Sequence, residues 1–347
     1  MLVIGIDVGK EELVACLQQS LSGEPPRVIG SLQTVANTLS GHNKLVRWLE
    51  KQLQAQDLAP DLSSSQVHVV LEATNVYWEA CAYHFYALGC PVSVMNPAQI
   101  KFFARSTLRR GKTDAMDAEI IARFGLMMRP ALWTPPSPGL LAVKQLGRER
   151  EAMLTELGRE RNRLQALQRA QYTSPVLVRL AKQRMRLLER QTHQLEEIIR
   201  AAFARDPELQ TQLELLLSVP GFGFIAAATV LAETNGFATL EDGHQVAAYA
   251  GLAPAPNQSG LSNRKGSISK VGNARLRRIA YLAALGARNS NSRFKAFYES
   301  LRERGKPPRL ALVALARKLL RVGLAVVKSG QPYQAAYQRP AQTSCVT

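Results

Sequence analysis

The sequence predicts an α/β domain with a mixed sheet over residues 1–140, a helical hairpin or coiled coil over 141–205, and a mainly helical domain over 206–335. Three observations predict this order. Strand-like and helical patterns alternate in the first third of the chain. The middle segment has almost no glycine and repeats leucine at helical spacing. The last part has helical patterns interrupted by two glycine-rich stretches, and the tail over 336–347 has no periodicity.

Three runs of β-type composition open the chain, and helix and strand patterns alternate after them. Short apolar runs predict strands over residues 2–7, 13–18, 27–34, 67–71 and 92–95. Helical spacing predicts helices over residues 38–53 and 76–88, and a further helix that begins near Thr113. Because three consecutive strands precede strands that are separated by helices, the sheet should be mixed. The proline-rich segment 133–138 ends this domain.

Two long helices are predicted between residues 140 and 205, with a break at Ser174-Pro175. Their apolar residues repeat at spacings of three, four and seven, and they are Met153, Leu157, Leu164, Leu167, Leu177, Leu188, Leu195 and Ile198. Two interpretations are open: an amphipathic pair that packs on its own domain, or a dimer interface with a basic face. Arginines beside the apolar positions argue against a regular two-stranded zipper.

The charge of the chain is strongly positive and unevenly distributed. The sequence has 44 Lys and Arg against 27 Asp and Glu, a net charge of +17. Residues 1–140 hold 12 basic and 12 acidic residues, so residues 141–347 carry the whole excess. Such a surplus indicates a polyanionic partner, either nucleic acid or an anionic membrane surface. Hydrophobic residues make up 46% of the chain, enough for a packed core, which excludes global disorder.

Cysteine usage and the longest apolar run exclude several protein classes. The four cysteines form no CxxC pair, which argues against a disulfide scaffold or a cysteine-based zinc site and fits a reducing cytosol. An acidic residue directly follows the first apolar strand, so we expect no signal peptide.

The uncharged run 215–232 is broken by Pro220-Gly221-Phe222-Gly223, which predicts two short helices and not a membrane span. This turn is typical of a phosphate-binding helix-hairpin-helix or of a plain αα turn.

Four carboxylates stand at the ends of predicted elements in the neutral domain. Asp7 and Glu72 each end an apolar strand, and Asp114 and Asp117 share one face at the start of a helix. Carboxylate oxygens are ligands of Mg²⁺, and two such ions about 4 Å apart stabilise both oxygens of a phosphodiester exchange. Singly, each acid also has a structural explanation, as a turn former, an exposed strand end or a favourable charge at a helix N-terminus. All four together favour a metal site.

The motif Gly5-Ile-Asp-Val-Gly9 also resembles the first phosphate loop of actin-like ATPases and sugar kinases. Those proteins need a second glycine-rich phosphate loop and an adenosine loop. Neither pattern follows within residues 1–140, so this alternative is weak.

A basic, glycine-rich segment over residues 251–278 is the second candidate site. Its residues at the expected helix start and on the following helix are Lys270, Gly272, Asn273, Arg275, Arg277 and Arg278. A helix N-terminus binds phosphate, and a serine flanked by glycine and arginine is a candidate nucleophile on phosphorus. The composition does not choose among Ser259, Ser262, Ser267 and Ser269. The alternative is a solvated basic loop without chemistry.

The motifs of both candidate sites resemble those of one family, the DEDD transposases of insertion sequences, which are recombinases guided by a bridge RNA. In the first domain the resemblance lies in Gly5–Lys10, Glu72–Trp78, Asn96-Pro97 and Lys112–Ala118. In the last domain it lies in Val219–Gly223, Gly251–Pro254, Gln258–Gly260, Ile268–Asn273 and Leu276-Arg277. The motifs stand in the family's order over nearly the whole chain. One departure is Asn75, where the family often has glycine, although asparagine tolerates the left-handed backbone.

The resemblance implies an α/β RuvC-like domain with the ribonuclease H fold, in which Asp7, Glu72, Asp114 and Asp117 bind Mg²⁺. It also implies that Ser259 attacks the scissile phosphate and holds the DNA covalently, with the carboxylates of one protomer paired with the serine of another. Family members assemble as dimers and tetramers around two DNAs and a non-coding RNA.

The implied partners are therefore the element ends, the target DNA and a bridge RNA, in a bacterial cytoplasm at the nucleoid. Residues expected to contact nucleic acid are Arg109, Arg110, Lys112, Gly221, Gly223, Arg264, Lys265, Lys270, Arg275, Arg277 and Arg278. Two other functions are kept as alternatives. One is a metal-dependent junction endonuclease in which water is the nucleophile, and the other is an architectural nucleic-acid-binding protein whose acids are structural.

Overall fold

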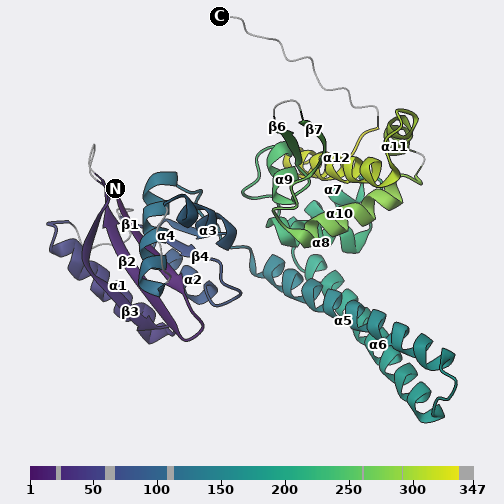
Figure 1. Ribbon diagram of the computed structural model, residues 1–347, viewed down its shortest axis with the longest axis horizontal. Coiled ribbons are helices and arrows are strands. Elements are labelled where there is room, and N and C mark those ends of the chain that lie inside the picture. The colour runs from purple at the N-terminus through teal and green to yellow at the C-terminus, as the bar shows by residue number, and fades with distance from the viewer. Residues whose placement is uncertain (21–24, 59–66, 108–112, 260–261, 291, 336–347) are drawn as a thin grey trace, which may run out of the picture. The chain divides into compact units, whose positions relative to one another are not determined.

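The computed structural model describes residues 1–20, 25–58, 67–107, 113–259, 262–290 and 292–335 (Figure 1). For residues 256–259 and 262–267 it describes the course of the backbone and not the side chains. The chain divides into two compact units, Met1–Pro135 and Pro136–Thr347. The helices within the described ranges are all too short or too polar to cross a membrane.

The first unit is built on one five-stranded mixed sheet. Its strands are β1 (Leu2–Val8), β2 (Glu12–Gln19), β3 (Arg27–Ala36), β4 (Val67–Glu72) and β5 (Val92–Met95). Their order across the sheet is β3-β2-β1-β4-β5. The first three strands form an antiparallel meander, while β4 is parallel to β1 and β5 is parallel to β4. All five predicted strands are confirmed, and the mixed sheet with its helices fits an α/β ribonuclease H-like domain.

Helices cover both faces of this sheet, as Figure 1 shows. Helices α1 (Leu39–Gln54) and α2 (Glu79–Ala87) bury their apolar residues against one face, with Ile4 and Ile6 of β1. Helices α3 (Pro97–Ser106) and α4 (Asp114–Met128) cover the other face, with Val3 and Val70. Side chains alternate between the faces along each strand, which explains the two separate apolar clusters.

Helix α3 is an element that the sequence analysis missed. Its start carries a recognisable signal, because the Asn96 side chain accepts a hydrogen bond from the Ala98 amide at 2.9 Å and Pro97 occupies the first helical turn. Both features are typical of a helix N-terminus. The helix is short and buries only Ile100 fully, so its apolar periodicity is weak.

Helix α4 lies unusually close to the centre of the sheet. A Cβ atom at Gly5 of β1 would overlap the backbone of Ala118 and Ala122 on α4. A Cβ atom at Gly125 would lie 2.7 Å from the Val3 side chain and 2.8 Å from that of Val70. Small residues on both elements therefore allow backbone-to-backbone packing, and this packing fixes the position of the α4 N-terminus relative to the end of β1.

The second unit is mainly helical and starts with two long helices, α5 (Pro138–Arg169) and α6 (Pro175–Ala204), which pack against each other. The remaining elements are α7 (Pro207–Leu217), α8 (Phe224–Thr234), α9 (Gly243–Tyr249), β6 (Pro254–Ser259), β7 (Ser262–Ile268), α10 (Ala274–Ala287), α11 (Arg293–Glu303) and α12 (Pro308–Ser329). One large apolar core joins α7, α8, α10 and α12. The predicted break of the 215–232 run into two short helices is confirmed.

The second glycine-rich stretch, which interrupts the helical pattern of the last part of the chain, forms two strands that the sequence analysis missed. The segment 254–268 forms the antiparallel hairpin β6–β7, in which Pro254 pairs with Ile268 and Ser259 pairs with Ser262. These strands are rich in serine, asparagine and proline, so they lack the alternation of apolar residues that reveals a half-buried strand.

The close packing of α4 on β1 yields a stability prediction. We expect Gly5→Ala to destabilise the first unit by about 1–3 kcal/mol or more, because the added methyl group meets helix backbone that has no room to move aside. Denaturant unfolding monitored by circular dichroism measures this. The matched control is Gly158→Ala on α5, where a Cβ atom meets no neighbouring atom within 4 Å. There the change should stabilise the helix by about 0.5–1 kcal/mol. Equal stability of Gly5→Ala and the wild type would contradict the proposed packing constraint.

Candidate active site

The candidate site begins with two acids that end neighbouring strands. In the parallel pair β1–β4, Ile6 stands opposite Leu71, so the next positions, Asp7 and Glu72, are adjacent. Side chains two residues apart share a face, and Val3 and Val70 lie on the face that α4 covers. Asp7 and Glu72 therefore project from the sheet on the side of α4.

Helix α4 supplies the other two acids from its first turn. Thr113 caps the helix, since its side-chain oxygen accepts a hydrogen bond from the Met116 amide at 3.2 Å. Asp114 and Asp117 follow at once, and the close packing on Gly5 sets this helix end beside the end of β1. One carboxylate oxygen from each of Asp7, Asp114 and Asp117 lies within 4.8 Å of the others.

The charges of this cluster act on one another. Burial, and after it the charges of Asp117, Asp114 and Glu72, raise the pKa of Asp7 from 3.8 to about 6. All four predicted acids are thus close enough to interact electrostatically, although Glu72 is not among the three with oxygens within 4.8 Å. Asp114 is exposed to solvent, so the cluster is open on one side.

This donor set fits a divalent cation. Its ligand atoms are all hard carboxylate oxygens, and Mg²⁺ is bound by a few such groups that leave positions for water and substrate phosphate. A bound cation would also compensate the mutual repulsion that raises the pKa of Asp7. Asp7, Asp114 and Asp117 are the residues that would hold the ion, with Glu72 beside them.

The predicted nucleophile lies on the hairpin of the second unit. Ser259 is the last residue of β6, and its backbone pairs with Ser262 across the hairpin. The side chains of Ser259, Arg264 and Lys265 are outside the part of the chain that the structure describes. The predicted contacts Arg109, Arg110 and Lys112 lie in segment 108–112, which is also outside the described residues.

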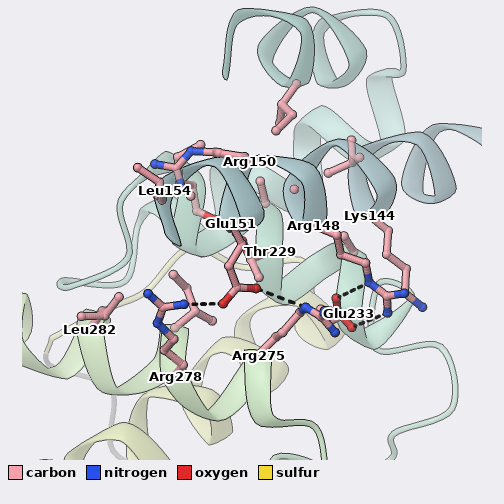
Figure 2. A pocket seen from close by; sticks show the side chains of 17 residues that line it. Lys144, Arg148, Arg150, Glu151, Leu154, Thr229, Glu233, Arg275, Arg278 and Leu282 are labelled. Carbon is pink, nitrogen blue, oxygen red and sulfur yellow. Dashed lines mark hydrogen bonds and ion pairs between the residues drawn. The ribbon is translucent and has the colours of Figure 1, made fainter. Parts of the chain in front are cut away.

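Three of the predicted phosphate contacts on α10 are engaged within the protein. Arg277 donates from Nη1 to the carbonyl oxygens of Ala250 and Lys270, each at 3.1 Å. Arg275 pairs with Glu151 of α5 at 3.1 Å, and Arg278 donates to the second oxygen of the same carboxylate (Figure 2). Sequence alone gave no signal for these pairs, because the partners are more than a hundred residues apart.

The two glycines of the α7–α8 turn differ in their surroundings. Gly221 has a φ of +107°, and a Cβ atom there would lie 2.6 Å from the Ala287 side chain and 2.7 Å from the Ala283 carbonyl oxygen. This glycine serves the packing of the turn on α10. Gly223 caps α8 and has open space where its Cβ atom would be, so of the two it is the one with room for a ligand.

One buried ionic group was not foreseen. Glu233, near the end of α8, is 5% exposed and accepts hydrogen bonds from Arg148 of α5 and from Asn273 at the start of α10. Figure 2 shows Glu233 and Arg148 side by side at a pocket between α5, α8 and α10. The only sequence signal was an acid directly after an 18-residue uncharged run.

Two family models match the chain, and together they include both candidate sites. Residues 4–172 match the model of the DEDD transposases of IS110 elements, and residues 213–299 match "Transposase IS116/IS110/IS902 family". The four acids fall within the first match, and the β6–β7 hairpin falls within the second. The chain belongs to the IS110 family of transposases. This confirms the family that the sequence motifs indicated.

The chain is also similar to proteins of known name. The "Pilin gene-inverting protein" of Moraxella bovis is 29% identical over 334 residues, which cover 95% of this chain and 97% of that protein. Its counterpart from Moraxella lacunata is equally similar. A solved structure of T. thermophilus RuvC in complex with a Holliday junction substrate is 16% identical, covers 37% of this chain and 96% of that one, and has a TM-score of 0.26.

The acid cluster yields a prediction about stability and metal binding. In the presence of EDTA at pH 7.5, we expect Asp7→Asn to raise the Tm of the first unit by a few degrees, because one of several repelling, partly buried charges is removed. The same change should abolish the Tm increase that Mg²⁺ gives the wild type. Differential scanning calorimetry measures both effects.

The pH dependence of this difference has a definite sign. The folded-state pKa of Asp7 is raised above its ordinary value, so its contribution to stability is full below about pH 3.8 and is lost as the pH rises through about 6. The Tm gap between Asp7→Asn and the wild type should therefore be wide at pH 7 and close toward pH 4. Glu50→Gln on α1, on the opposite face of the sheet, is the control and should show no such gap. A pH-independent gap would refute the assignment to Asp7.

Proposed function

We propose that this transposase cuts and rejoins DNA strands through a covalent phosphoserine at Ser259, with Mg²⁺ at Asp7, Glu72, Asp114 and Asp117. The observation that carries the proposal is the convergence of three of these carboxylates within 4.8 Å in a member of the IS110 family. The name of the Moraxella relatives describes gene inversion, which requires strands to be both cut and rejoined.

The proposed reaction balances without any consumed cofactor. The Ser259 oxygen attacks the scissile phosphorus and loses its proton, while the bond from phosphorus to the leaving deoxyribose oxygen breaks and that oxygen is protonated. In the second step a deoxyribose hydroxyl of the other strand attacks the phosphoserine and releases the serine. A metal ion, when bound, would supply positive charge to the phosphate oxygens.

Residues of the basic half would hold the DNA and a guide RNA in this reaction. The excess of +17 lies in residues 141–347, and we infer that both the element ends with their target and a non-coding bridge RNA bind there. Lys270 is exposed at the base of the hairpin and is a direct candidate for a phosphate contact. Association with the nucleoid in the cytoplasm would follow from this binding.

The proposal includes assembly of two or more copies through the long helices. Several large apolar side chains of α6 are exposed to solvent, among them Leu177, Leu180, Leu187 and Ile198. Exposed apolar residues in a row are typical of a helix that packs on a partner. We propose that a second copy covers them in a coiled-coil arrangement, and that carboxylates and serine from different protomers act together.

The nucleophile is tested with single serine variants. Ser259→Ala should bind DNA and RNA with normal affinity but form no protein–DNA adduct that survives denaturation, because it lacks the attacking oxygen. Gel analysis of labelled substrate after denaturation measures this. Ser262→Ala, Ser267→Ala and Ser269→Ala are matched controls and should retain the adduct.

Two outcomes would change the proposal. If Ser262→Ala or Ser267→Ala loses the adduct while Ser259→Ala keeps it, the nucleophile is misassigned. If all serine variants recombine normally, water is the nucleophile and the chain is a metal-dependent endonuclease. Mixing Ser259→Ala with Asp114→Asn protomers should restore some recombination if different copies share one site.

Binding should depend strongly on salt. Each phosphate contact adds about −0.9 to the slope of log K against log salt on duplex DNA, so several contacts give a steep slope. We expect Lys270→Ala to make this slope shallower by about one unit. Lys44→Ala on α1 of the neutral unit also removes an exposed cation and should leave the slope unchanged. Fluorescence anisotropy titrations at several salt concentrations measure the slope, and a flat dependence in the wild type would argue against phosphate binding.

A further inference from the structure

Glu233 is the most deeply buried ionic group described in the second unit. Its side chain is 4% exposed, while that of its partner Arg148 is 42% exposed. Arg148 donates from Nε to Oε1 at 3.2 Å and from Nη2 to Oε2 at 3.4 Å. Burial alone would raise the pKa of this carboxyl, but the hydrogen bonds from Arg148 and Asn273 and the charges of Arg148 and Lys144 lower it overall, so Glu233 stays ionised.

Glu233 is connected to both ends of the segment that forms the hairpin, through its carboxylate at one end and its backbone carbonyl at the other. Asn273 Nδ2 donates to Oε2 of Glu233 at 2.8 Å, and the same asparagine caps α10 by accepting from the Leu276 amide at 3.0 Å. The Tyr249 hydroxyl donates to the carbonyl oxygen of Glu233 at 2.9 Å. The backbone amide of Asn273 in turn donates to the carbonyl oxygen of Tyr249 at 2.6 Å. Glu233 therefore holds the end of α9 and the start of α10 together.

The base of the hairpin is fastened at the same place. The backbone amide of Lys270 donates to the carbonyl oxygen of Gly251 at 3.1 Å, and that of Ser269 donates to the carbonyl oxygen of Ala253 at 2.9 Å. Gly272 has a φ of +139°, and a Cβ atom there would lie 2.5 Å from the Tyr249 carbonyl oxygen. The two strands beyond this base pair with each other as far as Ser259 and Ser262. The direction in which the hairpin leaves the helical body is thus set by its base.

Burying a carboxylate between helices carries a large cost in free energy. Removing a charge from water costs several kcal/mol unless it is paired, and apolar residues of similar volume often hold helices together as well. A charged group with fixed hydrogen-bond directions instead selects one geometry. At this position the geometry that it selects is that of Asn273, of the α10 N-terminus and of the hairpin base.

We propose that Glu233 is a positioning residue of strand exchange, which orients the β6–β7 hairpin and so the Ser259 that the hairpin carries. This inference rests on the proposed function of Ser259. Glu233 itself touches no reacting atom in this proposal, because it acts through Asn273 and the hairpin base.

The first test separates the rate of the reaction from binding. In Glu233→Gln, formation of the covalent adduct at saturating DNA should slow by about 10- to 100-fold, since a misplaced reacting group costs rates of this order. The dissociation constant for DNA should change less than about threefold. The matched control is Glu196→Gln. It breaks another arginine–glutamate ion pair, that of Arg150 and Glu196 at 2.7 Å between α5 and α6. Its rate should equal that of the wild type.

A compensating substitution provides the second arm. Glu233→Gln removes the negative charge that pairs with Arg148. Adding Asn273→Asp returns one carboxylate to the site, where the glutamine amide donates a hydrogen bond to it, and aspartate remains a good helix cap. Asn273→Asp alone places two carboxylates together and should be slow. The double variant should form the adduct at least tenfold faster than Glu233→Gln alone. A double variant as slow as the slower single variant would overturn the proposal.

The third arm measures the hairpin base without any chemistry. Hydrogen exchange of the Ser269, Lys270 and Asn273 amides should be at least tenfold faster in Glu233→Gln than in the wild type, and unchanged in Glu196→Gln. Unchanged exchange or an unchanged rate overturns the role of Glu233. Absence of a Ser259-dependent adduct in the wild type instead overturns the proposed function, and hydrogen exchange still decides whether Glu233 anchors the hairpin.

Discussion

The candidate metal site depends on the contact between helix α4 and strand β1 at Gly5. Without a side chain at this position, the helix backbone at Ala118 and Ala122 comes against the strand backbone. Val3 and Val70 pack on Gly125, about one turn beyond Ala122 and two turns beyond Ala118, so the contact fixes the helix along its length. Asp114 and Asp117 are thereby brought to Asp7, where burial and the neighbouring negative charges together raise the pKa of Asp7. Apolar packing therefore offsets the cost of assembling these charges.

Much of the first unit followed from the sequence because its signals are local. Short apolar runs in β1 and β4 placed Asp7 and Glu72 at strand ends, and the spacing of three in α4 placed Asp114 and Asp117 on one face. The sequence did not reveal α3, whose apolar face is small, or the β6–β7 hairpin, whose strands are polar. The glycines of the α7–α8 turn suggested a phosphate contact, yet Gly221 is required for packing on α10.

Interactions between distant residues were the part that sequence could not give. The Arg148–Glu233 pair spans 85 positions, and the pairs that Glu151 makes with Arg275 and Arg278 span more than 120. Each of these contacts depends on how α5 packs against α8 and α10, and no short-range pattern encodes that. The consequence is chemical as well as structural. The net charge of the sequence suggests that every arginine of the basic half is available to nucleic acid. In the fold, several of these arginines instead pair with carboxylates of the same chain.

The two candidate groups of this transposase are held by different physical means. The carboxylates lie at strand ends and at a helix start that share an apolar interface, so their positions are set by packing. The serine stands at the far end of a two-stranded hairpin, whose own strands are polar and whose base is fixed by directional hydrogen bonds around Glu233 and Asn273. Packing tolerates little displacement, while directional hydrogen bonds at the base set the direction in which the two strands leave the helices. A metal site needs fixed ligands, and the proposed nucleophile Ser259, which would form a bond to one strand and be released by another, needs a defined direction of approach. The distribution of apolar and polar anchoring in this sequence matches that division of roles.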